Sequence, residues 1–322
     1  MFHIKDFNET DHGFAEICRV ENLINHDSIS HPDEKKDHWK IRNKSRYYDK
    51  ILAYNDDSLV GLINLAQGEG SNDRNFYFSI YIDPTYNGKG VRKLLYKELL
   101  KRTQKFNCIA LYPSIYDHPN YNQDKKFFLD NGFKLVQKNR EYSLKLEGCD
   151  TAPYESLLEK LDGEGIKILE SVVELNKDPS HYRKLEELEW IYDQDMPMPD
   201  GIQHYRTPFD EWMKDIKHFE DKYYGIELVA IKNQMYIGST DIEVMKKSDP
   251  YKAWTGGLGV HPDYRRKGVA TALKVVAINK LRERGIKEIR TDNEENNPMY
   301  KINVALGFQP VPFRLDYKKK LV

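Results

Sequence analysis

The chain has 322 residues, of which 39% are hydrophobic, 12% aromatic and 31% charged. Lys and Arg number 50 against 51 Asp and Glu, so the formal net charge is -1. This apolar content excludes a wholly disordered chain, the balanced charge argues against nucleic-acid binding, and no run approaches the ~18 apolar residues of a membrane span. The three cysteines are far apart and form neither a zinc motif nor a disulfide framework. We therefore expect a soluble, cytoplasmic protein that binds no metal, nucleic acid or membrane.

From the N-terminus onward, the first half of the chain carries short segments that recur in the second half. Three such pairs stand in the same order at a nearly constant spacing of about 175–178 residues, which predicts a duplicated unit. The paired segments are 59–62 with 236–239, 83–91 with 261–269, and 131–134 with 306–309.

The end of the first copy is marked by a stretch that disfavours regular structure, Glu147 to Pro153. A short helix can follow over 154–161, and a new strand begins at Ile166. We therefore predict a first domain at 1–147, a linker at 148–164 and a second domain at 165–322.

The second copy shows the element pattern of a mixed α/β domain. The order expected in each copy is strand, helical region, hairpin, strand, helix, strand, helix, strand. For the second copy we predict a hairpin over 227–232 and 235–244, a glycine-rich strand over 254–260, a helix over 268–284 with Gly285 as its cap, a strand over 286–291, and a helix that starts at Asn297-Pro298 and ends at Gly307. In the first copy Asn107 stands at the place that matches Gly285, and asparagine also tolerates positive φ.

The sharpest chemical signal is Arg265-Arg266-Lys267-Gly268-Val269-Ala270, between a predicted strand and a predicted helix. A helix start offers unpaired N–H groups and partial positive charge, which suits a phosphate or pyrophosphate. A solvated basic turn is the alternative. Two other phosphate loops are excluded, because 87–90 lacks the Walker ending and 257–262 has proline in place of the third glycine of a dinucleotide loop.

This region resembles the GNAT superfamily of acyl-CoA-dependent N-acyltransferases. The family's pyrophosphate loop, Arg/Gln-x-x-Gly-x-Gly/Ala, is matched by Arg265, Gly268 and Ala270, and residues 291–308 are similar to the segment that follows in the family. The doubled arrangement is similar to that of tandem acetyltransferases such as mycothiol synthase. The resemblance implies two tandem GNAT-like domains of mixed α/β fold, with acetyl-CoA as co-substrate.

The resemblance also implies where the cofactor binds. Glycines at 256, 257 and 259 suit a bulge in the strand, beside which the pantetheine arm would lie. A backbone N–H near Val260 would polarise the thioester carbonyl. The implied cofactor-binding residues are Leu258, Gly259, Val260, Arg265, Arg266, Lys267, Gly268, Val269, Ala270, Thr271, Asn293 and Asn297. Asn297 serves equally well as a helix cap.

The acid and base are less clearly marked. Direct attack needs a neutral amine, so a base helps, but the glycine-rich strand carries no carboxylate where many relatives have a glutamate. Asp241 and Glu243 on the preceding strand are the candidates, with Glu243 preferred and a solvated strand face as the alternative. Relatives often have a tyrosine at the position of Asn303 that protonates the leaving thiolate, and Tyr300 lies on the same helical face.

The first copy departs from the motif. Asn87 stands in place of Arg265, Arg92 in place of the small Ala270, and Phe128 near the position of the helical tyrosine. We predict a degenerate domain that is structural or shapes the substrate site, the alternative being a second working site that uses Gly88 and Gly90.

An acidic and aromatic stretch, Trp190 to Gly201, is expected to cover the acceptor site, where Asp193, Asp195 and Asp200 would attract a cation. The sequence thus predicts an N-acetyltransferase that moves an acetyl group from acetyl-CoA to a primary amine of a small molecule by direct attack. Two alternatives stay open, a non-catalytic acyl-CoA-binding protein and a tandem aminoacyl transferase.

Overall fold

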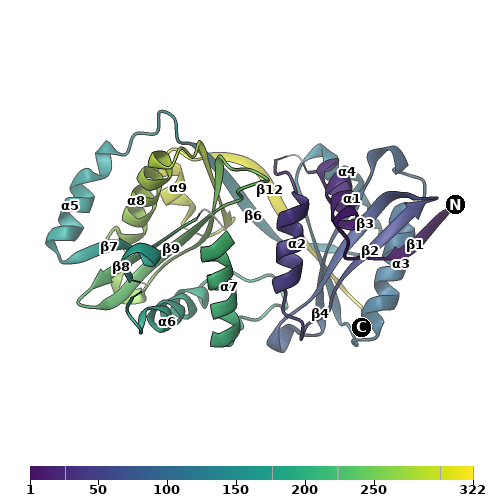
Figure 1. Ribbon diagram of the computed structural model, residues 1–322, viewed down its shortest axis with the longest axis horizontal. Coiled ribbons are helices and arrows are strands. Elements are labelled where there is room, and N and C mark those ends of the chain that lie inside the picture. Colours follow the sequence, from purple (N-terminus) through teal and green to yellow (C-terminus); the bar gives the residue numbers. More distant parts are fainter. Residues whose placement is uncertain (26, 176, 223–224, 298, 322) are drawn as a thin grey trace. The chain divides into compact units, whose positions relative to one another are not determined.

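The computed structural model describes residues 1–25, 27–175, 177–222, 225–297 and 299–321. The described chain forms two compact units, each discontinuous in sequence (Figure 1). Unit 1 comprises 1–139, 198–205 and 312–322, and unit 2 comprises 140–197 and 206–311. Compared with the predicted limits of 1–147 and 165–322, the last segment of the chain joins unit 1 and residues 140–164 join unit 2. Pro298, predicted to open the last helix, lies outside the described residues.

Unit 1 has a sheet in the order β1-β2-β3-β4-β5-β12. Its elements are β1 (Phe2–Asp6), α1 (Asp11–Asn22), α2 (Pro32–Ile41), β2 (Tyr48–Asn55), β3 (Ser58–Gln67), β4 (Asn75–Ile82), α3 (Val91–Gln104), β5 (Ala110–Tyr116) and α4 (Asn122–Asp130). The sixth strand is the C-terminal part of β12 (Gln309–Lys320), which runs antiparallel to β5, with Arg314 opposite Tyr116.

Unit 2 repeats the arrangement in the order β6-β11-β10-β9-β8-β7. Its elements are the end of β6 (Lys134–Lys145), α5 (Glu155–Gly163), β7 (Ile166–Glu170), α6 (His181–Asp193), α7 (Phe209–Lys222), β8 (Ile226–Lys232), β9 (Met235–Val244), β10 (Lys252–Val260), α8 (Val269–Glu283), β11 (Glu288–Glu294) and α9 (Tyr300–Ala305). The predicted hairpin is therefore present as β8 and β9, and the predicted helix as α8.

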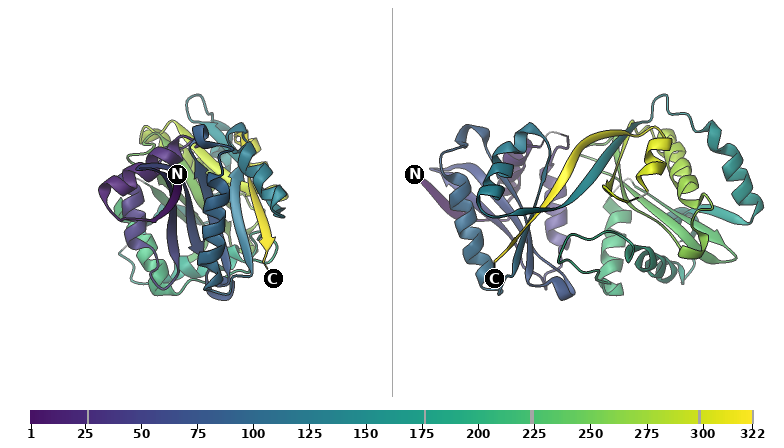
Figure 2. Two further views of the ribbon diagram at one scale, coloured as in Figure 1. Left: turned by 90° about the vertical axis from the view of Figure 1, so that its right-hand side faces the viewer. Right: turned by 180° about the vertical axis from the view of Figure 1, so that it is seen from behind.

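Helices cover both faces of each sheet, as Figure 2 shows for each unit. In unit 2, Gly238 on β9 lies against Val269 and Leu273 of α8, whereas the next residue, Ser239, contacts Tyr192 of α6. Since successive residues of a strand point to opposite faces, α8 and α6 pack on opposite sides. Gly61 of unit 1 meets Val91 and Leu95 of α3 in the same way.

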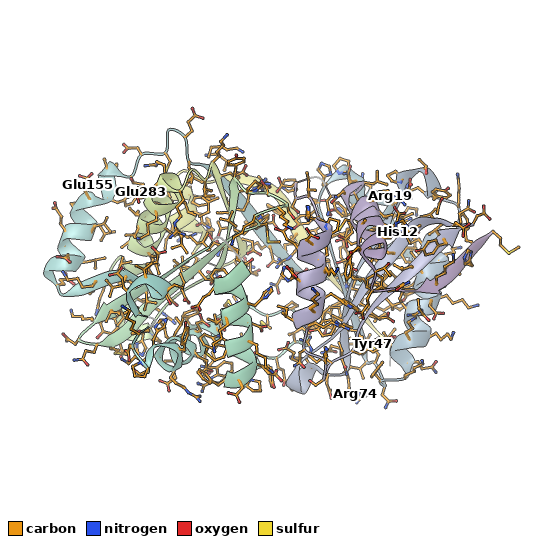
Figure 3. The ribbon with its side chains drawn as sticks, in the orientation of Figure 1. His12, Arg19, Tyr47, Arg74, Glu155 and Glu283 are labelled. Atoms are coloured by element: carbon orange, nitrogen blue, oxygen red, sulfur yellow. The ribbon has the colours of Figure 1, made fainter. Side chains whose placement is uncertain are left out.

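The side chains drawn in Figure 3 fill the space between these layers. Glu155 and Glu283, labelled there, begin α5 and end α8. Gly285 follows α8 with φ of +77°, and Asn107 follows α3 with φ of +50°. Both residues thus have the left-handed conformation predicted for the caps, which glycine and asparagine adopt at low cost.

The two central parallel strands of unit 2 pair over only a short distance. β10 and β11 are in register from Lys252 to Trp254 against Glu288 to Arg290, yet β10 continues to Val260 and β11 to Glu294. Beyond the paired part, their facing backbone groups are not joined to each other. This separation leaves the edge of β10 available at one end of the sheet.

Candidate active site

A β-bulge interrupts β10 where the two parallel strands separate. Thr255 is opposite Ile242 and Leu258 is opposite Thr240, so Gly256 and Gly257 together face the single residue Asp241. The Asp241 carboxylate accepts a hydrogen bond from the Gly257 N–H, and the Thr240 hydroxyl donates to the Gly257 carbonyl at 2.7 Å. The bulge is therefore held by side chains of the neighbouring strand.

Beyond the bulge, the backbone of β10 presents groups to the open side. The His261 N–H bonds the Ile237 carbonyl on β9, so strand alternation turns the N–H groups of Leu258 and Val260 the other way. The Val260 carbonyl accepts a hydrogen bond from Arg265 Nε at 3.0 Å, which agrees with that direction. N–H groups on an open strand edge are of the kind that bonds an extended ligand or a developing oxyanion, which is the role that the sequence predicts for Leu258 to Val260.

The loop after β10 has the conformation of an anion-binding turn. Arg266 has φ of +59° and Gly268 has φ of +89°, so left-handed residues alternate with others and turn successive N–H groups to one side. The first helical bond of α8 runs from the Ala272 N–H to the Gly268 carbonyl. The amides of Val269, Ala270 and Thr271 therefore precede the first intrahelical donor and are available to a phosphate.

The basic side chains of this loop have different partners. Arg265 bonds the Val260 carbonyl and forms an ion pair with Asp195, so it fastens the loop to β10 and to the segment after α6. Lys267 donates to the Asp263 carbonyl at 2.9 Å and lies over the Tyr264 ring. Arg266 is exposed. Its side chain supplies long-range attraction for an anion, while Arg265 and Lys267 stabilise the turn.

Asn293 and Asn303 meet at the free end of β11. The Asn303 side-chain amide donates to Asn293 Oδ1 at 2.7 Å, while Asn303 Oδ1, in a residue only 1% exposed, has no partner in the described part of the chain. Tyr300 is half-buried on the same helix. Asn297 accepts a hydrogen bond from the Met299 N–H, so it forms the turn that leads into α9.

A buried lysine, which the sequence analysis did not single out, lies on α8. Lys274 is 5% exposed, its Nζ has no hydrogen-bond partner among the described residues, and it lies 5.1 Å from the centre of the Phe308 ring. Burial lowers its pKa to about 8. Together with Asn303, it leaves uncompensated polar groups in the interior that α8 and α9 share, as expected where a polar ligand completes the packing.

Carboxylates gather on the α6 face beside the bulge. Asp241 has a pKa raised to about 6, chiefly by burial, and its cross-strand partner Glu227 has a pKa raised to about 8 for the same reason. Glu189 of α6 has a pKa well above its usual range, because it is buried near Glu227. Glu243 is the cross-strand neighbour of Trp254, which precedes the bulge in β10 and is therefore farther from the loop. Burial raises the pKa of Glu243 as well. A group that holds its proton more strongly is suited to accept one from an amine.

Of the three aspartates predicted to cover the acceptor site, the structure brings one to these carboxylates. Asp193 ends α6, and burial raises its pKa to about 6. Asp195 is the ion-pair partner of Arg265. Asp200 belongs to unit 1, where it forms an ion pair with Lys318 at 2.8 Å.

The corresponding region of unit 1 is built differently. Its loop has the same turn, with Gly88 and Gly90 at φ of +76° and +92°, but β3 and β4 pair from Gly61 to Gln67 without a bulge. Arg92, in place of Ala270, forms a buried ion pair with Asp124 of α4 at 2.8 Å. Phe128, in place of Asn303, is fully buried among aromatic rings. Unit 1 thus has larger side chains, Arg92 and Phe128, where unit 2 has Ala270 and Asn303.

Comparison with known families agrees with this geometry. The model of the acetyltransferase (GNAT) family matches twice, at residues 14–133 and 185–305. The chain belongs to the GNAT acetyltransferase family. Its two matches confirm the tandem arrangement, and membership makes the protein an acyltransferase that uses acyl-CoA. No curated protein matches the sequence at a significant level.

Solved structures show the same tandem fold. A tandem GNAT protein from the clavulanic acid biosynthesis pathway matches with a TM-score of 0.79 at 16% identity, over 99% of this chain and 98% of that one. A GCN5-related N-acetyltransferase from Sphaerobacter thermophilus matches with a TM-score of 0.69 at 15% identity, over 99% and 95%. A glucosamine N-acetyltransferase region of a fungal β-N-acetylglucosaminidase matches with a TM-score of 0.72 at 14% identity, over 98% of this chain and 38% of that one.

Within the described residues, no helix is long and apolar enough to cross a membrane. The same part of the chain contains no group of three or more His, Cys, Asp or Glu side chains arranged to hold a metal ion.

Proposed function

We propose that unit 2 transfers an acetyl group from acetyl-CoA to a primary amine of a small molecule by direct attack. The observation that carries this proposal is the bulge of β10, which combines in one place a free strand edge, the start of α8 and the half-buried Asp241 carboxylate. Acyl-CoA supplies an activated thioester, and the residues described above supply the sites for its parts.

The residues present fit the donor. The amides of Val269, Ala270 and Thr271 would bind the pyrophosphate, with Arg266 adding positive charge nearby. The backbone of Leu258 and Val260 would bond the pantetheine arm, and the unpartnered Asn303 Oδ1 and Lys274 Nζ offer an acceptor and a donor to its amides. The Val260 N–H would bond the oxygen on which negative charge develops.

We propose Asp241, in preference to Glu243, as the base. The amine nitrogen forms a bond to the thioester carbonyl carbon, the carbon–sulfur bond breaks, and CoA leaves as a thiolate. The amine proton passes to the Asp241 carboxylate, which lies at the bulge, whereas Glu243 lies beside Trp254 before it. A raised pKa of about 6 keeps Asp241 ionised at neutral pH while making it more basic than an ordinary aspartate.

The leaving thiolate needs little assistance, because a thiol has a pKa near ~8.5. Tyr300 and Asn303, on one face of α9, are the candidates to donate a hydrogen bond to it. The Asn303 amide already bonds Asn293, so Tyr300 is the better donor of the two.

We propose that unit 1 binds no acyl-CoA and supports the fold. Three features support this role: a regular β4 without a bulge, the Arg92–Asp124 ion pair across α3 and α4, and the buried Phe128. A second working site that uses Gly88 and Gly90 would require all three to change.

The proposed donor site is tested by Ala270→Arg, which copies Arg92 into unit 2. Unit 2 has Met299 near the position of Asp124 and so offers the new arginine no carboxylate. We expect CoA affinity, measured by calorimetry, to fall at least 50-fold and thiol release from acetyl-CoA to cease. Gly268 is a poorer choice, because its φ of +89° and the nearby Leu157 side chain would strain any larger residue.

Asn87→Arg is the control, because it adds the same charge to the equivalent loop of unit 1. We expect CoA affinity to stay within twofold of the unmodified protein. Unchanged affinity in Ala270→Arg, or a large change in Asn87→Arg, would show that the donor is bound elsewhere. CoA binding without thiol release over a broad amine panel would favour a non-catalytic acyl-CoA-binding protein.

A further inference from the structure

Five carboxylates face one another on the α6 side of the sheet in unit 2. Glu227 and Asp241 are direct cross-strand partners, Glu243 follows on β9, and Glu189 and Asp193 come from α6. Glu227 is 4% exposed. Each of the three residues Glu189, Glu227 and Asp241 has at least one other carboxylate among the groups that disfavour its charged form.

Within the described part of the chain, no lysine or arginine forms an ion pair with any of these five groups. Two of them have hydrogen bonds from uncharged donors: Trp212 Nε1 donates to Glu189 at 2.8 Å, and the Gly257 amide donates to Asp241. Buried carboxylates usually have a cationic partner. The cluster adjoins the bulge, where the acceptor has to meet the thioester.

In unit 1, a lysine of the chain itself occupies the position that Glu227 has in unit 2. Lys50 and Asn64 are cross-strand partners in unit 1, in the register that Glu227 and Asp241 have in unit 2. Lys50 Nζ donates to Asn64 Oδ1 at 2.7 Å, and the Asn64 amide donates to Glu21 at 2.8 Å. A primary ammonium group of the chain itself therefore occupies this position in unit 1.

A second lysine of unit 1, Lys35, also helps to neutralise the buried Glu21 carboxylate. Lys35 forms an ion pair with Glu21 Oε2 at 2.8 Å, and the Ser30 hydroxyl donates to the same oxygen at 2.7 Å. Unit 1 thus balances one buried carboxylate with two lysines from its own chain. Unit 2 has replaced Lys50 by a glutamate and retains no chain cation in the described contacts of the cluster.

We infer that the acceptor is a diamine or longer polyamine, whose reacting nitrogen lies beside Asp241 while a second, protonated nitrogen is bound by Glu227 and Glu189. The inference rests on the proposed function, because it places the acceptor in the site of unit 2. Two nitrogens are required. The nitrogen beside Asp241 must be deprotonated to react, so a second, protonated nitrogen has to neutralise Glu227 and Glu189.

The test is calorimetric titration of the full chain, loaded with CoA, with two probes that differ in one charged group. The probes are 1,4-diaminobutane and butylamine. We expect the diamine to bind at least 30-fold more tightly. In Glu227→Gln the affinity for the diamine should fall at least tenfold, whereas that for butylamine stays within twofold.

Glu189→Gln is a second variant, in case Glu227→Gln fails to fold, and it retains an oxygen for Trp212. It should lower diamine affinity selectively in the same way. Glu227→Lys, which copies unit 1, should abolish the preference for the diamine. Glu186→Gln is the matched control, because Glu186 is on α6 but pairs with Arg206 outside the cluster; it should leave both affinities unchanged.

Equal affinity for the two probes, or a diamine preference that persists in Glu227→Gln and Glu189→Gln, would overturn the inference. Thiol release is measured separately with both amines. If butylamine is acetylated as efficiently as the diamine, the proposed function stands and the inference fails. If the diamine binds selectively but no amine releases thiol, the acetyltransferase function fails while the binding site stands.

Discussion

At the scale of single residues, one position on β9 decides what the site can do. Asp241 is opposite two glycines instead of one residue, and its carboxylate bonds the amide of the bulge. Its cross-strand partner is the buried carboxylate of Glu227. In unit 1 the same two positions are Asn64 and Lys50, which cannot act together as a base. The two units thus differ at these two positions: unit 2 has the proposed proton acceptor Asp241 with Glu227, and unit 1 has the hydrogen-bonded pair Lys50 and Asn64.

Asp241→Asn is expected to lower kcat/KM about 100-fold, because it removes the proposed proton acceptor and preserves the hydrogen bond to Gly257. In the unmodified protein, kcat/KM should fall with decreasing pH through about 6, as the carboxylate whose pKa is raised to about 6 takes up a proton. A pH profile of thiol release measures both effects. Glu243→Gln is the comparison and should stay within threefold; the reverse order would assign the base to Glu243.

Glu227 should make stability depend on pH. Its pKa rises from 4.5 to about 8 on folding, so the folded state holds a proton that the unfolded chain releases between these values. Stability is then greatest below pH 4.5 for this group and is lost as pH rises through 8. We expect Glu227→Gln to show a smaller fall in Tm between pH 5 and pH 8 than the unmodified protein. Parallel Tm curves for the two proteins would contradict this.

At the scale of elements, the helix after the phosphate loop distinguishes the two units. Both loops have the same backbone turn, but the second residue of α8 is Ala270 and that of α3 is Arg92. In unit 1 that arginine ties α3 to α4 through Asp124. In unit 2 the contacts come from the segment predicted as a linker. Leu157 of α5 lies against Gly268, and the Tyr154 hydroxyl donates to the Ala305 carbonyl of α9.

Arg92→Ala should destabilise unit 1, because it leaves the 5% exposed Asp124 carboxylate without its partner. Breaking a buried pair in this way costs about 3–5 kcal/mol. Denaturant unfolding measures the loss, and calorimetry should show no new CoA site, since Phe128 still fills the interior. A gain of one CoA per chain would instead support a latent second site.

At the scale of the whole molecule, each unit is completed by a segment from the other half of the sequence. The last strand of the chain pairs with β5 in unit 1, and residues 140–145 of β6 belong to unit 2. A strand at a sheet's edge buries apolar side chains and satisfies backbone groups of its neighbour. Leu315 and Tyr317 of β12 are buried in the core of unit 1.

Truncation after Val311 should therefore unfold unit 1 although it removes residues from the opposite end of the sequence. Hydrogen exchange should show loss of protection in β4 and β5, while α8 and β9 of unit 2 stay protected. Protection lost first from unit 2 would contradict this assignment of the last strand. For the same reason, residues 165–322 expressed alone should lack part of their sheet.

The sequence by itself determined the duplication, the mixed α/β class, the turn between β10 and α8, and the family, because these depend on short local signals: glycine and basic residues in the turn before a helix, and segments repeated at one spacing. The caps at Gly285 and Asn107 are of the same kind. The repeat spacing also relates Lys50 to Glu227 and Asn64 to Asp241, because both pairs are 177 residues apart. Only the tertiary structure decided the carboxylate cluster, the contact of Leu157 with Gly268, and the exchange of the terminal strand. Each of these brings together residues far apart in the chain, and their pairing is set by strand register and the burial of whole elements, which local sequence does not encode.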